Sequence, residues 1–279
     1  EAGRPSNFSM RIGDPNITYS AHQVGLYLQD DWRVSRGVLI TPGIRYGFQS
    51  HVGDKGNLSP RVTAAWSPLR NGNLTVRGSY GYFYDWISGG LYKQTLLVDG
   101  TRIRDINMVN PSYPDPGAGG AAAPSNQYLW SDDLLLPNAH RANVGVDRVV
   151  TKNGRLSATY NFGWGRNLLR GRNLNTPEGG LRPDPAFANI VELQSDAGSR
   201  THTLSVNYSF VRLDWKRAFM MANYTIGSSR TNTTGAFSLP ANGDNLDTEW
   251  GPSQGDIRHR AGGSLNMSPW RDLSFGLNV

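Results

Sequence analysis

The stretch LTVRGSYGYFYD, residues 74–85, alternates strictly between two kinds of side chain. One parity begins with Leu74 and Val76, while the other holds small and polar residues such as Thr75 and Arg77. Side chains two residues apart lie on the same face of a β-strand. The stretch therefore predicts a strand with one apolar and one polar face. Its tyrosines gather at one end of the apolar face: Tyr80, Tyr82 and Tyr84.

The same alternation recurs along the chain and predicts about ten amphipathic strands. They cover residues 22–34, 38–48, 58–66, 74–85, 140–150, 155–164, 201–210, 217–226, 257–267 and 272–279. Their opposite parity is mostly Gly, Ser, Thr, Asn and Arg. No segment has apolar residues at the spacing of a long amphipathic helix. None approaches the ~18 consecutive apolar residues of a membrane-spanning helix. The sequence predicts an all-β fold.

The connections between these strands alternate between short and long. The short ones are VSRG, SPLRNGN, VTKNG, RLDWK and SPWRD, and the long ones cover about 49–57, 86–138, 168–200 and 229–255. Compact soluble domains rarely contain several long structureless loops, whereas outer-membrane barrels have short periplasmic turns and long external loops. We therefore predict an antiparallel up-and-down transmembrane β-barrel. A soluble β-sandwich, whose strands also alternate, is the alternative.

Aromatic residues support the barrel because they change ends with strand direction. Barrels of the outer membrane have aromatic girdles at both interfaces. We predict an outer girdle at the long-loop ends of the strands and an inner girdle at the short-turn ends. The outer girdle comprises Tyr46, Phe48, Tyr80, Tyr82, Tyr84, Phe162, Trp164 and Tyr224, and the inner one Trp32, Trp66, Tyr208 and Phe210.

Four of the five histidines open descending strands on the apolar parity: His22, His140, His202 and His259. A metal centre would need them within one coordination sphere, yet their strands are spread around the wall. We interpret them as interfacial residues of the outer rim.

Composition and charge exclude several other functions. The 279 residues have a formal net charge of +6 but no cysteine, so thiolate metal sites and disulfides are absent. The arginines are scattered rather than clustered, which argues against nucleic-acid binding. In DIRHR (256–260) the side chains of the acid and of the histidine point to opposite faces of the strand. The sequence also contains no nucleophile motif. We predict no enzymatic activity and no cofactor.

One loop offers a weak candidate for a cation site. Asp244, Asp247 and Glu249 could supply oxygen ligands to calcium. Their spacing is not that of an EF-hand, so a solvated loop is the favoured interpretation.

Three arginines on consecutive strands are candidates to line the lumen: Arg45, Arg61 and Arg77. Each lies on the polar parity beside small residues, and the guanidinium fork suits carboxylate or phosphate. Three interpretations stay open. They could be solvated lumen charges, pair with acidic residues of a plug, or form a track for an anionic ligand.

The sequence resembles a known family through several motifs in the same order. These are LYLQDDWRVS, LITPGIRY, NLSPRVTAAWSP, LTVRGSYGYFYD, LPNAHRANVGVDR, NLLRGRNLNTP and GPSQGDIRHR. Together they are similar to the barrel of Oar-like TonB-dependent receptors of Acidobacteria and Myxobacteria.

That resemblance implies a 22-stranded barrel, an internal plug and an N-terminal carboxypeptidase-regulatory-like domain. Residues 1–279 are then expected to be a partial barrel domain without the plug or the N-terminal domain. It also implies a bacterial outer-membrane location, contact with outer-membrane lipid, and TonB binding through the plug. The expected function is uptake of a bulky nutrient such as a carbohydrate, a peptide or a metal chelate. The alternatives are a structural, adhesion or secretion-linked barrel, and a small complete porin.

Overall fold

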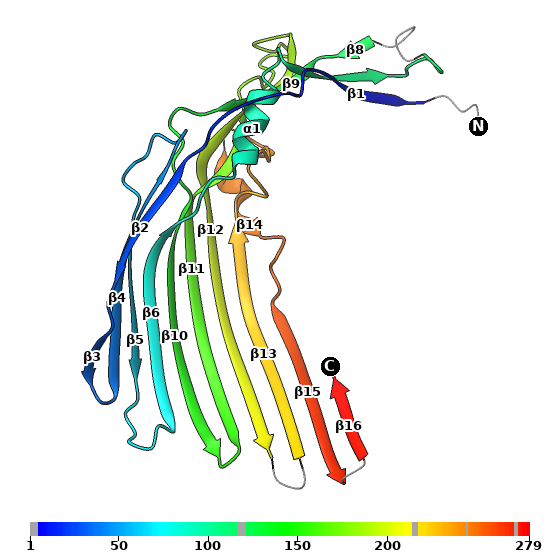
Figure 1. Cartoon of the computed structure of the whole chain (residues 1–279). Helices are drawn as coiled ribbons and strands as arrows, with labels where there is room; N and C mark the ends of the chain where they lie inside the picture. Colours follow the sequence, from blue (N-terminus) through cyan, green and yellow to red (C-terminus); the bar gives the residue numbers. More distant parts are fainter. Residues whose placement is uncertain (1–4, 116–120, 214–216, 244, 271–272) are drawn as a thin grey trace.

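The computed structural model describes residues 5–115, 121–213, 217–243, 245–270 and 273–279. Ten strands of one antiparallel sheet lie side by side in sequence order (Figure 1), which confirms the up-and-down arrangement. They are β2 (Gln23–Gln29), β4 (Val38–Gln49), β5 (Leu58–Trp66), β6 (Leu74–Tyr84), β10 (Asn138–Thr151), β11 (Gly154–Asn173), β12 (Phe187–Arg212), β13 (Arg217–Thr231), β15 (His259–Trp270) and β16 (Leu273–Asn278).

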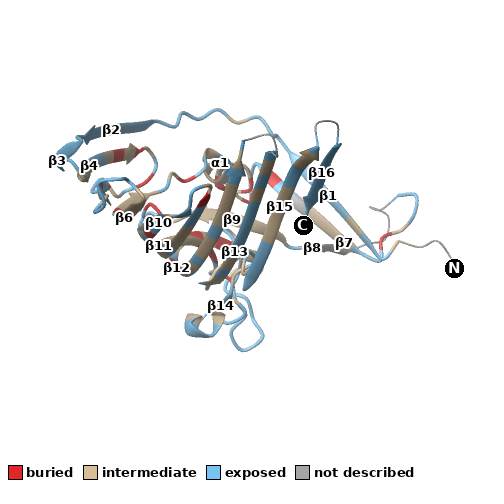
Figure 2. Cartoon of the chain, turned by 90° about the horizontal axis from the view of Figure 1, so that it is seen from below, coloured by how far each residue is buried: buried red, intermediate tan, exposed pale blue. Residues whose placement is uncertain are grey.

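The sheet is a curved, open wall. Figure 1 shows the bend along the strands, and Figure 2 shows the row of strands from below. Within the part of the chain that the structure describes, β2 and β16 are the two ends of the sheet and do not pair with each other. Each of them therefore leaves one row of backbone N–H and C=O groups without a ladder partner.

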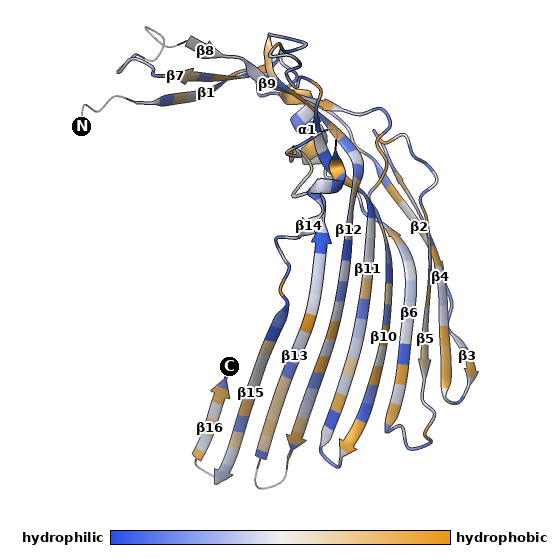
Figure 3. Cartoon of the chain, turned by 180° about the vertical axis from the view of Figure 1, so that it is seen from behind, coloured by the Kyte–Doolittle hydropathy of each residue, from blue (hydrophilic) through white to orange (hydrophobic). Residues whose placement is uncertain are grey.

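One face of the wall is apolar and not covered by protein. Side chains of the apolar parity remain largely exposed; Leu26 is 65%, Val144 is 52% and Leu204 is 42% accessible. Figure 3 shows alternating apolar and polar positions along the strands. The register keeps apolar partners on one face, with Val146 opposite both Val76 and Ala158. We call this side the apolar face and the other the polar face.

The first predicted strand, 22–34, is divided into β2 and β3 (Trp32–Ser35), which both pair with β4. The ladder is interrupted where Asp30 lies beside Pro42, which has no N–H to donate. Asp30 N–H still donates to the Pro42 carbonyl at 3.2 Å. The carboxylate of Asp30 accepts the indole N–H of Trp32 at 2.6 Å.

The prediction of an external loop over 168–200 is wrong, because strands β11 and β12 continue far into it. They pair along Leu168–Asn173 after an irregularity at Asn167, whose φ is 53°. The connection between them is only residues 174–186. Beyond the predicted membrane region no hydrocarbon faces the strand, so the apolar alternation that reveals a strand is lost.

The segment 86–138 is likewise more ordered than predicted. It contains α1 (Gly89–Leu97), β7 (Ile103–Val109), β8 (Ala121–Ala123) and β9 (Ser125–Trp130). β7 pairs with β8 and with β1 (Asn7–Gly13) in a small separate sheet, and β9 runs parallel to β12. Part of the low-complexity stretch PSYPDPGAGGAAAPSN, at residues 116–120, falls outside the described residues.

The segment 229–255 also contains regular structure. β13 extends to Thr231, followed by the 3₁₀ helix η2 (Leu246–Glu249) and by β14 (Gly251–Pro252), which pairs with β13. Across the residues that are described, no helix has the length and apolar character needed to cross a bilayer.

Candidate functional site

The most deeply buried cluster lies among the long connections rather than in the strands of the wall. It consists of Val52, Ile87, Leu134, Leu136 and Leu193. The connections 49–57 and 86–138 and the upper part of β12 therefore share one core. Sequence analysis missed this core because its residues are separated widely along the chain and follow no period.

Hydrogen bonds between side chains and backbone groups hold these connections together. The Gln49 side chain donates to the Ile87 carbonyl at 2.7 Å and accepts the Ile87 N–H at 2.9 Å. The Trp130 indole N–H donates to the His51 carbonyl at 2.7 Å. Loops held in this way form a structured cap, which can present binding residues in fixed positions.

A turn after α1 is organised by one carboxylate. Burial tends to raise the pKa of Asp99, but N–H donors of Arg102 and Thr101 outweigh it and hold the pKa below its ordinary value. The carboxylate therefore stays ionised and keeps the turn closed at neutral pH.

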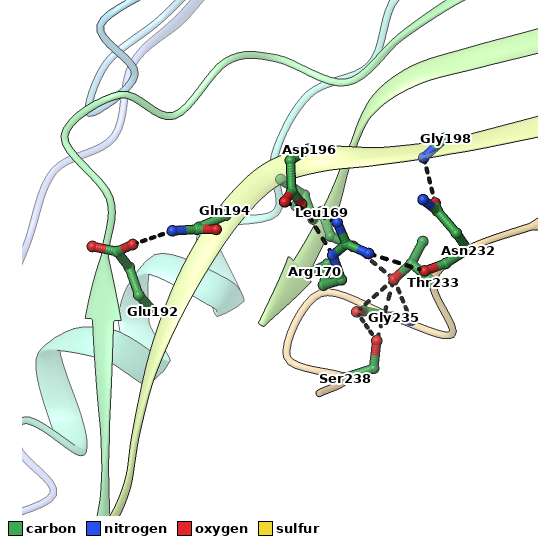
Figure 4. A network of polar contacts seen from close by, with 10 residues as sticks. All are labelled: Leu169, Arg170, Glu192, Gln194, Asp196, Gly198, Asn232, Thr233, Gly235 and Ser238. Carbon is green, nitrogen blue, oxygen red and sulfur yellow. Dashed lines mark hydrogen bonds and ion pairs between the residues drawn. The ribbon is translucent and has the colours of Figure 1, made fainter. Parts of the chain in front are cut away.

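A second network joins the upper part of the wall to the segment 232–250 (Figure 4). The side chain of Arg170 is only 3% exposed; its Nε donates to Asp196 at 3.0 Å, and its Nη2 lies 2.8 Å from the same carboxylate. Its Nη1 donates to the Asn232 carbonyl at 3.4 Å, and the Thr233 hydroxyl donates to the Leu169 carbonyl at 3.0 Å. This network fixes the segment onto β11 and β12.

The three candidate arginines lie on β4, β5 and β6 of the polar face, and they do not form one site. Arg61 is directly opposite Gly81, which is four residues from Arg77 along β6. Four residues correspond to ~13 Å along a strand. This separation is too large for Arg61 and Arg77 to hold one ligand group together with Arg45.

Each of these arginines extends across a glycine of a neighbouring strand. A Cβ placed on Gly25 would be 3.0 Å from Arg45, and one on Gly43 would be 3.0 Å from Arg61. At Gly145 the distance to Arg77 would be 3.1 Å. The glycines thus leave the space that the long side chains occupy, as expected of small neighbours, although each of them lies on a neighbouring strand and not beside the arginine on its own strand.

The partners of the three arginines differ. The guanidinium carbon of Arg45 lies 5.8 Å from the Trp86 ring centroid, whereas Nε of Arg61 is buried without a hydrogen-bond partner. Arg77 forms an ion pair with Asp147 of β10. An acidic partner on the wall itself was not among the predicted alternatives. Whether these side chains face a lumen stays a prediction.

The predicted girdle residues lie at the two ends of the wall. Trp32 and Trp66 both pair with the first residues of β4, beside a short turn, and Tyr208 pairs with Leu156, two residues into β11 after the short turn at 152–153. Trp164 lies opposite His140, at the end of β10 that follows a long connection. The remaining predicted girdle residues each lie on their strand toward the girdle for which they were predicted: Tyr46, Phe48, Tyr80, Tyr82, Tyr84, Phe162, Phe210 and Tyr224. Their role at a membrane interface stays a prediction.

A tyrosine–histidine contact repeats three times at the long-loop end of the wall. Phenol oxygen and histidine Nδ1 are 2.8 Å apart in Tyr80–His140 and 2.7 Å apart in Tyr160–His202 and in Tyr224–His259. In each case the tyrosine lies diagonally across the strand pair from the histidine. We call these three contacts the Tyr–His row. Sequence analysis placed the histidines at the rim but missed their partners, because the register was not known.

The weak cation candidate gains no support. Asp244 lies outside the described residues; Asp247 N–H is bound to Asn245, and Glu249 accepts the N–H of Ala241 at 2.8 Å. No group of three His, Asp or Glu side chains within the described ranges could hold a metal ion. In DIRHR, Asp256 accepts the Ser229 N–H at 2.6 Å and pairs with Arg258 at 3.2 Å, which gives it a structural role.

Comparison with known proteins places this geometry in a family. Residues 51–271 match the family model described as outer membrane beta barrel domain. The TonB-dependent transporter Oar of Myxococcus xanthus is 27% identical over 142 residues, which are 46% of this chain and 13% of that protein. The chain thus spans about an eighth of the length of this relative.

Solved outer-membrane transporters share the fold. The transporter YddB of Escherichia coli superposes with a TM-score of 0.65 at 14% identity, over 89% of this chain and 31% of that one. The FrpB iron transporter of Neisseria meningitidis gives 0.55 at 12% identity, over 92% and 32%. At sequence identities this low, the superpositions show a shared fold of the wall and nothing further.

Proposed function

Since the chain belongs to the outer membrane beta-barrel domain family and lies in the outer membrane, we propose that it forms part of the wall of a TonB-dependent transporter. The observation that supports this most is the open sheet, whose end strands β2 and β16 are not paired with each other. Backbone groups in hydrocarbon must be paired, so a spanning sheet has to close. Further strands of a larger barrel would close it, with a plug domain in the lumen.

In this proposal the protein takes up a bulky nutrient (a carbohydrate, a peptide or a metal chelate) and transforms nothing chemically. The structured cap over the wall would bind the ligand first. An energised inner-membrane partner would then displace the plug through TonB. The relative from Myxococcus xanthus, which is named a TonB-dependent transporter, supports this assignment.

Uptake by cells tests the proposal. Cells with and without the complete gene are compared for uptake of labelled oligosaccharides, peptides and iron chelates, before and after removal of TonB. We expect gene-dependent uptake of one class that disappears without TonB. Uptake that persists without TonB would contradict the proposal, as would passive entry of small sugars into vesicles, which a small porin predicts.

A further inference from the structure

Three arginines lie on the apolar face of the wall, just beyond the Tyr–His row. Arg200 is two residues from His202 on β12 and pairs with Trp164 of β11, while Arg230 of β13 pairs with Arg200. Arg166 follows Trp164 by two residues and therefore points to the same face. Two residues correspond to ~7 Å along a strand. We call Arg166, Arg200 and Arg230 the rim arginines.

The rim arginines surround an aromatic side chain. The guanidinium carbons of Arg166 and Arg200 lie 5.4 and 5.9 Å from the centroid of the Trp164 ring, and the His140 ring stacks on the same indole at 5.4 Å. Arg230 donates to the carbonyl of Trp250 at 3.3 Å. Trp250 comes later in the connection whose first part, Asn232 to Ser238, Figure 4 shows bound to Leu169, Arg170 and Gly198 of β11 and β12.

A cavity of about 530 Å³ is lined by Trp164, Arg166, Arg200, Asn232 and Trp250 together with short polar, alanine and glycine positions. Arg230 is not in its lining but is joined to it through the bond to Trp250. A Cβ added to Gly198 in its floor would come within 3.7 Å of the Trp250 ring. Two indoles and two guanidinium groups therefore meet at one hollow at the top of the apolar face.

Among the described residues, no unpaired carboxylate balances the charge of this hollow. Like charges directly opposite each other on paired strands are destabilising, yet Arg200 and Arg230 are in register and both are exposed. Within the described residues, none of the rim arginines lies within 4.0 Å of a carboxylate. Asp196 also lines the cavity, but its carboxylate is already paired with Arg170. The positive charge of the rim arginines can therefore be balanced by an anion from outside the protein.

We propose that the rim arginines bind the phosphate of a lipid headgroup in the outer leaflet. Guanidinium groups form paired, charge-assisted hydrogen bonds with phosphate oxygens. Tryptophan favours the boundary between hydrocarbon and water. The site opens on the face whose apolar side chains meet lipid, so a lipid reaches it more directly than a soluble anion does. This site is separate from nutrient uptake and does not depend on the proposed transport function.

The test uses the complete membrane protein that contains these residues, purified in a neutral detergent. Native mass spectrometry measures retention of phosphatidic acid, which has a phosphomonoester headgroup, and of phosphatidylcholine with the same acyl chains. We expect the wild type to retain phosphatidic acid preferentially. The double variant Arg200→Gln, Arg230→Gln should weaken this retention about tenfold or more, because two charge-assisted donors to the phosphate are lost.

A matched control is Arg260→Gln, one strand further on β15 and next to His259, on the polar face. It should leave lipid retention unchanged. If the wild type retains the two lipids equally, the proposal is wrong. This outcome is measured on the wild type alone, so it does not depend on whether the variants fold. Glycerol 3-phosphate that binds as tightly as the lipid would also overturn it and would indicate a site for soluble anions.

Discussion

The phenol oxygen of Tyr160 lies 2.7 Å from Nδ1 of His202, across the β11–β12 pair. The same diagonal contact joins Tyr80 to His140 and Tyr224 to His259. A polar contact that recurs toward the long-loop ends of the strands on an otherwise apolar face indicates where hydrocarbon gives way to headgroups and water. The repetition shows that the strands are in consistent register along this part of the wall.

The Tyr–His row should contribute measurably to stability. Tyr160→Phe removes the hydroxyl while keeping the ring, so we expect the free energy of unfolding to fall by about 1 kcal/mol. Urea unfolding of the complete barrel in lipid vesicles measures it. Tyr208→Phe is the control, because the Tyr208 hydroxyl makes no hydrogen bond to a described residue and its loss should change little. Equal losses in both variants would contradict the role of the row.

Neighbouring residues of β12 should respond oppositely to a charge. Val206→Arg places a guanidinium on the apolar face near the bilayer midplane, midway along β12 between His202 of the outer rim and Phe210 of the predicted inner girdle, and should cost about 2–4 kcal/mol. Ser205→Arg, one residue away and on the polar face, should cost much less. Unfolding in vesicles measures both, and tolerance of Val206→Arg would mean that the faces have been assigned the wrong way round.

The lumen assignment of Arg45, Arg61 and Arg77 can be tested by thiol labelling. Each is changed to cysteine, one at a time, in the complete protein with its plug deleted. A small water-soluble thiol reagent should reach these positions. Cysteines placed on the apolar face should react only with a membrane-soluble reagent; the matched positions are Ile44, Val62 and Val76. The opposite pattern would refute the assignment.

The ion pair of Arg170 and Asp196 should hold the segment 232–250 in place. Asp196→Asn leaves the buried guanidinium without its carboxylate, and we expect a loss of about 1.5–3 kcal/mol, since hydrogen bonds to charged groups are worth this much. Limited proteolysis should then cut this segment faster while the membrane strands stay protected. Asp147→Asn is the control, because it removes the carboxylate partner of Arg77 on the wall and leaves the segment untouched. An unchanged cleavage rate in Asp196→Asn would count against the network.

Most of the wall could be predicted from the sequence because its physical cause is local. A strand between hydrocarbon and a polar interior must alternate with period two, and LTVRGSYGYFYD displays that alternation directly. The order of the ten strands, their antiparallel pairing and the ends at which aromatic residues gather all follow from this pattern and from loop lengths.

Pairings across the sheet and above it could not be predicted in the same way. The continuation of β11 and β12 beyond the membrane region, and the core around Ile87 and Leu193, involve residues with no period to reveal them. The contact of Tyr160 with His202 and the juxtaposition of Arg200 with Arg230 depend on register. Sequence by itself determined which face of each strand is apolar, because side-chain alternation is a property of one segment. Tertiary structure alone decided which side chains meet, because a shift of one strand against the next changes every cross-strand partner.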